Sequence, residues 1–160
     1  MLVIAHAEEA DVPALAALLE EVDRFYGVTE FGSPSRREKQ IRDALFGPRP
    51  AAYALLAKDG QDLVGLASYS FLWPAAALTS SLFLKELYVR HDRQRRGIGR
   101  RLMGELFDIA ARAGCSRVEW QTEDDNEQAM GFYRSLGASV LRGKVFYRLD
   151  AEDLRRLAQS

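Results

Sequence analysis

Apolar residues follow two spacings along the chain, and these spacings predict a mixture of strands and helices. Short apolar runs, several with alternating polar positions, predict five strands at residues 2–7, 52–58, 63–73, 82–89 and 117–122. Apolar side chains three and four positions apart predict helices at residues 15–25, 35–46, 99–113 and 126–136. Residues 140–149 predict a last strand, and residues 150–158 predict a short terminal helix.

Turn and capping residues mark several of these boundaries. Asp11 followed by Pro13 is typical of a helix start, since aspartate caps the end and proline fits the first turn. Asp59-Gly60 lies between two strand patterns and favours a hairpin turn, so those strands should pair antiparallel. Gly114 follows the helix at 99–113 in a plausible C-cap position.

The order of elements predicts the fold class. A strand, two helices, three antiparallel strands and then alternating helices and strands give an α/β (α+β) fold with a mixed sheet. Strand-helix-strand connections near the C-terminus imply parallel pairing there, and ligands of such sheets bind where strands end and helices begin. A length of 160 residues fits one domain over residues 1–160.

Composition is that of an ordinary globular protein, with 48% hydrophobic and 28% charged residues. The N-terminus lacks a signal-peptide pattern and no apolar run is long enough to cross a bilayer, so we expect a cytoplasmic protein without a membrane partner. The single cysteine, Cys115, and two histidines are a poor inventory for a structural zinc site, and we expect no disulfide and no metal.

Net charge is −1, but the charges are unevenly placed. Residues 90–101 contain six arginines and one acid, whereas residues 119–127 contain five acids and no base. This pattern predicts a local anion site next to a cationic partner. A nucleic-acid site is the other interpretation of the arginines; the net charge and the lack of aromatic residues between them argue against nucleic acid as a partner.

The segment Gln94-Arg95-Arg96-Gly97-Ile98-Gly99-Arg100 lies between a predicted strand and a predicted helix. Its two glycines permit backbone conformations closed to other residues and a close approach of an anion to the main chain. The first turn of a helix has unpaired N–H groups and the positive end of the helix dipole, which favour a phosphate or pyrophosphate. The segment matches neither the dinucleotide fingerprint nor the phosphate loop with Gly-Lys-Ser/Thr.

With this segment the sequence resembles the GNAT superfamily of acetyltransferases, whose signature is Q/R-x-x-G-x-G/A. Gln94, Gly97 and Gly99 meet it, and the strand 83–89, Asn126 and the segment 129–138 stand in the family's order and spacing. The motif pattern is nearest to the diamine acetyltransferase-like branch. The resemblance implies acetyl-CoA as co-substrate and a mostly antiparallel twisted sheet of six to seven strands flanked by about four helices.

The resemblance also implies roles for individual residues. The pantetheine arm would pair with the main chain of Leu87 to Val89, the pyrophosphate with amides of the arginine-glycine segment, and Tyr133 would face the sulfur. The implied cofactor-binding residues are Leu87, Tyr88, Val89, Gln94, Arg95, Arg96, Gly97, Ile98, Gly99, Arg100, Asn126 and Ala129. The alternatives are a solvated helix face for the arginines and a packed helix aromatic for Tyr133.

Acetyl transfer needs a base, because a lysine-like amine with a pKa of about 10.4 is almost fully charged at neutral pH. Glu86 is the candidate base, and an ordinary salt-bridging residue is the alternative. The chain has Leu84-Lys85-Glu86 where diamine acetyltransferases carry Leu-Glu-Asp, and only one of Lys85 and Glu86 can face the site because strand residues alternate faces. Tyr133 is suited to protonate the leaving thiolate. The backbone N–H near Leu87 is suited to polarise the acetyl carbonyl group.

The predicted acceptor is the primary amine of a small molecule, such as a polyamine, an amino-acid derivative or an aminoglycoside-like compound. Acidic and aromatic residues at elements that flank the acceptor groove in similar enzymes are Glu20, Asp23, Tyr26, Glu119, Trp120, Gln121, Glu123 and Asp124. A protein acetyltransferase acting on lysine or an N-terminus and a noncatalytic acyl-CoA-binding module are the alternatives. A homodimer is also considered, with the apolar run 71–78 either at its interface or buried in the monomer.

Overall fold

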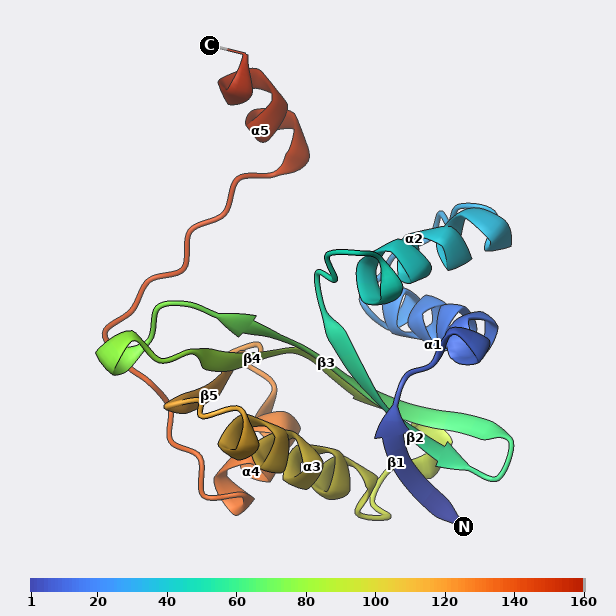
Figure 1. Cartoon of the computed structure of the whole chain (residues 1–160), viewed down its shortest axis with the longest axis horizontal. Helices are drawn as coiled ribbons and strands as arrows, with labels where there is room; N and C mark the ends of the chain where they lie inside the picture. The colour runs from blue at the N-terminus through green and yellow to red at the C-terminus, as the bar shows by residue number, and fades with distance from the viewer. Residues whose placement is uncertain (160) are drawn as a thin grey trace. The chain divides into compact units, whose positions relative to one another are not determined.

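The computed structural model describes residues 1–159. The chain forms two compact units, Met1–Gln121 and Thr122–Ser160. The first contains the sheet and three of the long helices, and the second contains the remaining two (Figure 1). One domain over residues 1–160 stays a prediction.

The first unit is built on a five-stranded sheet in the order β1-β2-β3-β4-β5. The first four strands pair antiparallel, and β4 pairs with β5 in parallel, as predicted for a strand-helix-strand connection. Gly60, with φ +63°, forms the tight β2–β3 turn that Asp59-Gly60 predicted. The strands are β1 Leu2–His6, β2 Tyr53–Asp59, β3 Asp62–Leu72, β4 Ser81–Val89 and β5 Arg117–Trp120.

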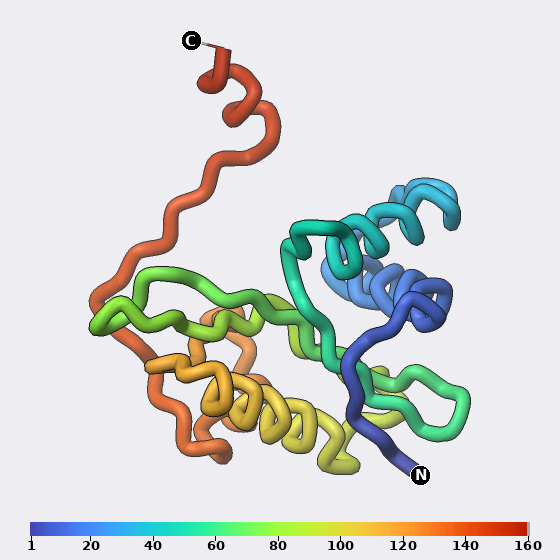
Figure 2. Tube along the Cα trace, viewed as in Figure 1, coloured from blue at the N-terminus to red at the C-terminus, as the bar shows by residue number. Residues whose placement is uncertain are grey.

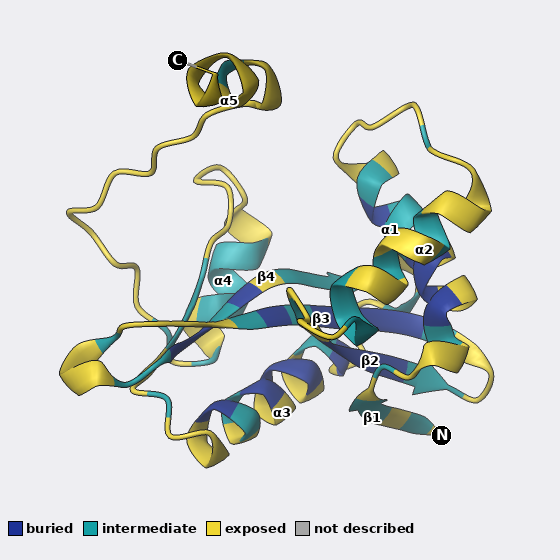
Figure 3. Cartoon of the chain, turned by 45° about the horizontal axis from the view of Figure 1, so that its top comes forward, coloured by how far each residue is buried: buried dark blue, intermediate teal, exposed yellow. Residues whose placement is uncertain are grey.

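Helices cover both faces of this sheet (Figure 1). Helices α1 (Val12–Phe25) and α2 (Pro34–Phe46) lie on one face, where Leu15 and Leu18 pack with Leu56 and Leu66 of the sheet. Helix α3 (Ile98–Arg112) covers the other face with a buried stripe, which Figure 3 shows in dark blue. This stripe comprises Ile98, Leu102, Met103, Leu106 and Ala110.

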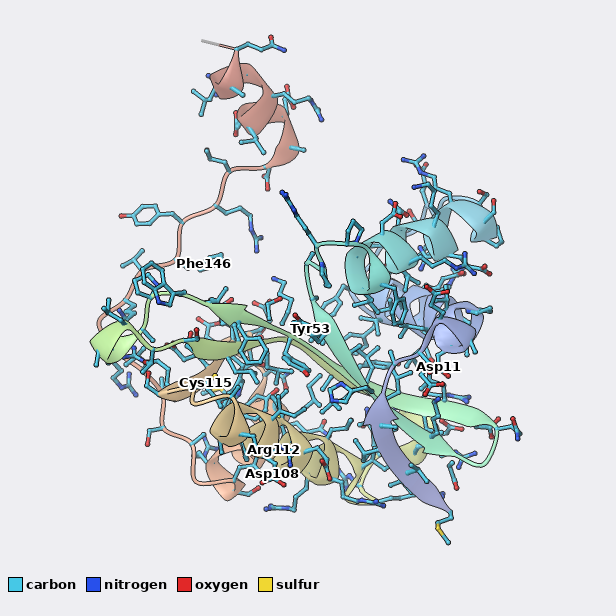
Figure 4. The ribbon with its side chains drawn as sticks, viewed as in Figure 1. Asp11, Tyr53, Asp108, Arg112, Cys115 and Phe146 are labelled. Atoms are coloured by element: carbon cyan, nitrogen blue, oxygen red, sulfur yellow. The ribbon has the colours of Figure 1, made fainter. Side chains whose placement is uncertain are left out.

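The predicted helix boundaries are largely right, although one cap works differently from the prediction. Asp11 precedes α1 and Pro13 lies in its first turn, but the Asp11 side chain makes no cap hydrogen bond. Its carboxylate accepts the Glu8 N–H at 2.9 Å and pairs with the Lys58 ammonium at 2.6 Å, which ties the start of α1 to β2 (Figure 4). Gly114 follows α3 with φ +72°, as expected for a residue that ends a helix.

The second unit contains α4 (Glu127–Ser135) and α5 (Ala151–Ala158), joined by an extended segment (Figure 2). The predicted strand at residues 140–149 is wrong: the described residues include five strands rather than six to seven, and five α-helices rather than about four. A strand requires a neighbouring strand to take its main-chain hydrogen bonds, and this segment pairs with none among the described residues.

Candidate active site

Strand β4 departs from regular alternation at the residues that carry the candidate base. Ser68 of β3 lies opposite Glu86, while Tyr69 lies opposite Leu84, so Lys85 is the extra residue of a β-bulge. The Lys85 side chain is exposed and the Glu86 side chain is partly buried. Because directly opposed residues project to the same face, Glu86 shares the face of Ser68.

The carboxyl group of Glu86 lies beside the end of α1. The Tyr26 hydroxyl donates a hydrogen bond to Glu86 Oε1 at 3.4 Å. Burial raises the pKa of Glu86, and the charge of Asp23 adds to the rise, while the Tyr26 hydrogen bond and the charge of Lys85 oppose it. A carboxyl group with a raised pKa is a stronger base than a surface carboxylate once it is ionised.

A cavity of about 330 Å³ lies between the two N-terminal helices and the sheet, and Ser68, the residue opposite Glu86, is part of its lining. Most of its wall is aliphatic, from α1, α2, β2 and β3. Its polar lining residues are Asp23, Arg37, Gln40 and Ser68. Since Ser68 is the cross-strand neighbour of Glu86, the cavity ends beside the strand pair that carries the candidate base.

Arg37 of α2 organises the polar side of this cavity. Its guanidinium pairs with the Asp23 carboxylate at 3.6 Å and donates to the Ala16 carbonyl at 3.4 Å. The guanidinium carbon lies 5.2 Å from the centroid of the Phe31 ring, and that of Arg24 lies 4.4 Å from the same ring. Phe31 therefore anchors the loop between α1 and α2 through two cation–π contacts.

The second half of β4 presents an open main-chain edge. Only Ser81–Leu84 of β4 pairs with β5, so within the described residues Lys85–Val89 have no strand partner on that side. The Gln94 side chain closes the end of this edge by donating to the Val89 carbonyl at 3.1 Å. Leu87, Tyr88 and Val89 thus lie on an edge that can take an extended chain.

The arginine-glycine segment leads from this edge into α3. Arg95 has φ 62° and Gly97, the residue before the helix, has φ 76°; Gly97 occupies the left-handed region that glycine tolerates best. The Ile98 side chain is 5% exposed and fixes the first turn of α3 to the core. The side chains of Arg95, Arg96 and Arg100 are exposed, whereas Arg93 is tied to Asp59 at 2.9 Å.

The remaining predicted site residues lie in the second unit, on and just before α4. Asn126 Oδ1 accepts the Ala129 N–H at 3.1 Å, so this asparagine caps the helix. Tyr133 is partly buried, with its ring centroid 5.4 Å from that of Phe132. The cap and the ring contact give both residues a structural role; their roles toward cofactor stay predictions.

Residues 15–138 match the model of the acetyltransferase (GNAT) family. The chain belongs to the GNAT acetyltransferase family. The family predicted from the motif is therefore confirmed, and so is an acyltransferase of the N-acetyltransferase type.

Individual relatives of this GNAT chain support the same assignment. A thialysine N-epsilon-acetyltransferase of Bos taurus is 26% identical, over 97% of this chain and 96% of its own length. A spermidine/spermine N(1)-acetyltransferase-like protein 1 of Homo sapiens is 27% identical over 97% of this chain and 23% of that protein. An integron cassette protein from the mobile metagenome of V. cholerae has the same fold, with a TM-score of 0.86 and 29% identity, covering 99% of this chain and 98% of that one.

Sequence reasoning missed two residues of the cavity. Arg37 and Ser68 line the cavity but lie far from the motif in sequence, and no local pattern distinguishes them from surface residues. Within residues 1–159, no helix is both long and apolar enough to span a bilayer. The same part of the chain contains no group of three or more His, Cys, Asp or Glu residues that could hold a metal ion.

Proposed function

We propose that this GNAT chain transfers the acetyl group of acetyl-CoA directly to the primary amine of a small molecule, within one catalytic domain. The observation that carries the proposal is Glu86, a partly buried carboxyl with a raised pKa, which lies opposite the cavity-lining residue Ser68. The family match runs from residue 15 to residue 138 and includes parts of both units, which supports a single domain. Two relatives named for acting on small amines, thialysine and spermidine or spermine, support this acceptor class.

The donor is bound by main-chain groups of the first unit. The open edge at Leu87–Val89 takes the extended pantetheine arm, and the N–H groups at the start of α3 take the pyrophosphate. Gly97 lets the main chain turn into the helix at that point, and Arg95 and Arg96 supply positive charge. Acetyl-CoA supplies the activated thioester when it is bound.

The chemistry requires three proton transfers. Glu86 removes a proton from the acceptor ammonium, directly or through one water, so that the amine nitrogen can form a bond to the carbonyl carbon. The Leu87 N–H stabilises the negative charge that develops on the carbonyl oxygen. As the C–S bond breaks, Tyr133 donates its phenolic proton to the departing thiolate. The nitrogen, which carries one proton more than the amide product, gives that proton to the Tyr133 phenolate, directly or through water, and the proton taken by Glu86 leaves to solvent.

The cavity beside Glu86 binds the acceptor. About 330 Å³ of mostly aliphatic wall suits the carbon chain of a small amine rather than a polymer. Asp23 at its polar end is paired with Arg37, so the carboxyl group that favours a cationic nitrogen is that of Glu86, on the strand beside Ser68. Lys85 does not oppose such a ligand inside the cavity, because the bulge leaves its side chain exposed.

The proposal is tested by release of free thiol from acetyl-CoA with a panel of polyamines, amino acids, aminoglycosides and lysine peptides. One class of small amine is expected to be turned over, and Glu86→Gln should lower kcat/KM for it by about 10²- to 10⁴-fold, the usual contribution of a general base. Glu105→Gln, at an exposed position of α3, is the matched control and should retain activity. Turnover confined to lysine peptides would point to a protein acetyltransferase, and an undiminished Glu86→Gln variant would remove Glu86 as the base.

A further inference from the structure

Some arginines near the start of α3 contact distant parts of the first unit. Arg90 Nε lies 3.9 Å from Glu21 Oε2 of α1. Arg101 donates to the Leu2 carbonyl of β1 at 3.1 Å. Arg93 makes the most extensive contacts of the three, because it reaches two carboxylates of another turn. The arginine-rich region is therefore not uniform, and part of it fastens this stretch of chain to the sheet.

Arg93 connects the chain after β4 to the turn between β2 and β3. Its Nη1 donates to Asp59 Oδ2 at 2.9 Å, and its Nη2 donates to Asp62 Oδ2 at 3.3 Å. Asp59 ends β2 and Asp62 begins β3, so the two carboxylates flank the tight turn at Gly60. The Arg93 side chain is only 24% exposed, and an arginine shared by two carboxylates is held more firmly than an isolated surface pair. We call Arg93, Asp59 and Asp62 the hairpin clamp.

The hairpin clamp lies directly before the main chain that is proposed to bind the pyrophosphate. Arg93 ends the short 3-10 turn His91–Arg93, and the next side chain, that of Gln94, donates to the Val89 carbonyl at 3.1 Å. Two residues beyond the clamp, Arg95 has φ 62°. A residue other than glycine keeps this left-handed conformation only where its surroundings hold it in place. The clamp and the Gln94 contact supply that hold immediately before Arg95.

We propose that Arg93 is a positioning residue for acetyl-CoA, which fixes residues 94–97 in their binding conformation through Asp59 and Asp62 and makes no phosphate contact of its own. Its guanidinium is already directed at the two carboxylates. Main-chain groups that are ordered in advance bind a ligand at a lower entropic cost, so loss of the clamp should weaken binding although no ligand contact is removed. The inference rests on the proposed function, because it takes this segment as the pyrophosphate site.

The two acids of the clamp give the most discriminating variant. Asp59→Asn/Asp62→Asn removes two negative charges near a polyanionic ligand and frees Arg93, so electrostatic attraction alone would tighten the binding of CoA. If the clamp positions residues 94–97, binding weakens instead. The dissociation constant of CoA, measured by titration calorimetry, and KM for acetyl-CoA should each rise about tenfold, while kcat and KM for the acceptor change less than about twofold. Asp59 also lies 3.3 Å from the Met1 amino group, so Asp62→Asn alone is included and should shift both constants in the same direction.

Variants of Arg93 complete the cycle. Arg93→Gln should weaken CoA binding by a similar factor, and Arg93→Lys should retain part of the affinity. The triple variant Arg93→Gln/Asp59→Asn/Asp62→Asn should bind no more weakly than Arg93→Gln, because all three changes remove the same clamp. Arg42→Gln removes another arginine–carboxylate pair, that with Glu38 of α2 at 3.4 Å, and is the matched control that should bind CoA like the wild type. Thermal unfolding followed by circular dichroism checks that each variant is folded.

Hydrogen exchange of the free protein tests the clamp without ligand or turnover. The amides of Arg93 and Gln94 donate to the carbonyls of Arg90 and His91 at 2.9 and 3.4 Å. Loss of the clamp should speed their exchange at least about fivefold and leave the interior of α3 unchanged.

CoA binding that is tighter or unchanged in the acid variant would overturn the proposal. Additive losses in the triple variant, or exchange as slow as in the wild type, would overturn it as well. Because CoA binding needs no acceptor, a wild type that binds CoA but acetylates no amine would contradict the proposed function and not this inference. A wild type that binds no CoA would overturn both.

Discussion

The carboxyl group of Glu86 is held by neighbours whose effects on its pKa oppose one another. Burial and the charge of Asp23 raise the pKa, and the Tyr26 hydrogen bond and the charge of Lys85 lower it, with a net rise. As a base, Glu86 acts only when ionised. Activity should therefore fall as pH drops through its raised pKa, and the position of this acidic limb reports the balance among the neighbours.

Two substitutions should move the acidic limb in opposite directions. Tyr26→Phe removes a hydrogen bond that stabilises the carboxylate, so the pKa of Glu86 rises further and the limb of the kcat/KM profile moves to higher pH. Asp23→Asn removes a like charge, so the pKa falls and the limb moves to lower pH. If neither variant shifts the acidic limb of the kcat/KM profile, the ionisation of Glu86 does not determine the position of that limb.

The sequence could identify Glu86 as a candidate base. It could not show which face of β4 its side chain lies on. Regular alternation placed Lys85 and Glu86 on opposite faces, yet the observed arrangement depends on a bulge. A bulge depends on the register in which β4 pairs with β3. No local sequence pattern in residues 81–89 indicates that register. Ser68 and Arg37 were missed for the same reason, since only tertiary structure brings them to the cavity.

At the scale of elements, the start of α3 depends on one backbone conformation. Gly97 has φ 76° and precedes the helix, and a Cβ at this position would meet no atom within 4 Å. A substitution there is thus strained by its backbone conformation and not by crowding. Gly104 lies in the interior of α3, equally uncrowded and exposed, but without a positive φ.

These two glycines should respond to alanine with opposite signs. Gly97→Ala should lower the free energy of unfolding by about 1 kcal/mol, the cost of a left-handed conformation for alanine, and should raise KM for acetyl-CoA. Gly104→Ala should raise the free energy of unfolding by about 0.5–1 kcal/mol through helix propensity, with KM unchanged. Urea denaturation and steady-state kinetics measure both; equal shifts in the two variants would contradict the role given to Gly97.

Periodicity located most elements of the first unit, because burial of one face imposes its spacing on the sequence. The helices with buried stripes and the paired strands lie within a few residues of their predicted positions. The segment 140–149 also has a strand-like composition, but composition shows only that a segment is able to form a strand. Whether it pairs depends on the presence of a neighbouring strand edge, which no local sequence pattern shows.

At the scale of the whole molecule, the family motif is more informative than the pattern of elements. The segment 94–100 and its flanking residues are enough to indicate a GNAT acetyltransferase, and the family match over 15–138 agrees. The identity of the acceptor amine could not be predicted in this way. The cavity proposed to bind it is formed by helices and strands whose sequences show only ordinary amphipathic patterns.

The central claim is direct acetyl transfer to a small amine with Glu86 as base. The most direct measurement follows free thiol and acetylated amine together, the first by a chromogenic thiol reagent and the second by mass spectrometry, for the wild type and Glu86→Gln. We predict one acetylated amine for each thiol released, with both rates reduced in parallel in the variant. Thiol released without acetylated amine, or an acetylated product formed equally fast by the variant, would contradict the account.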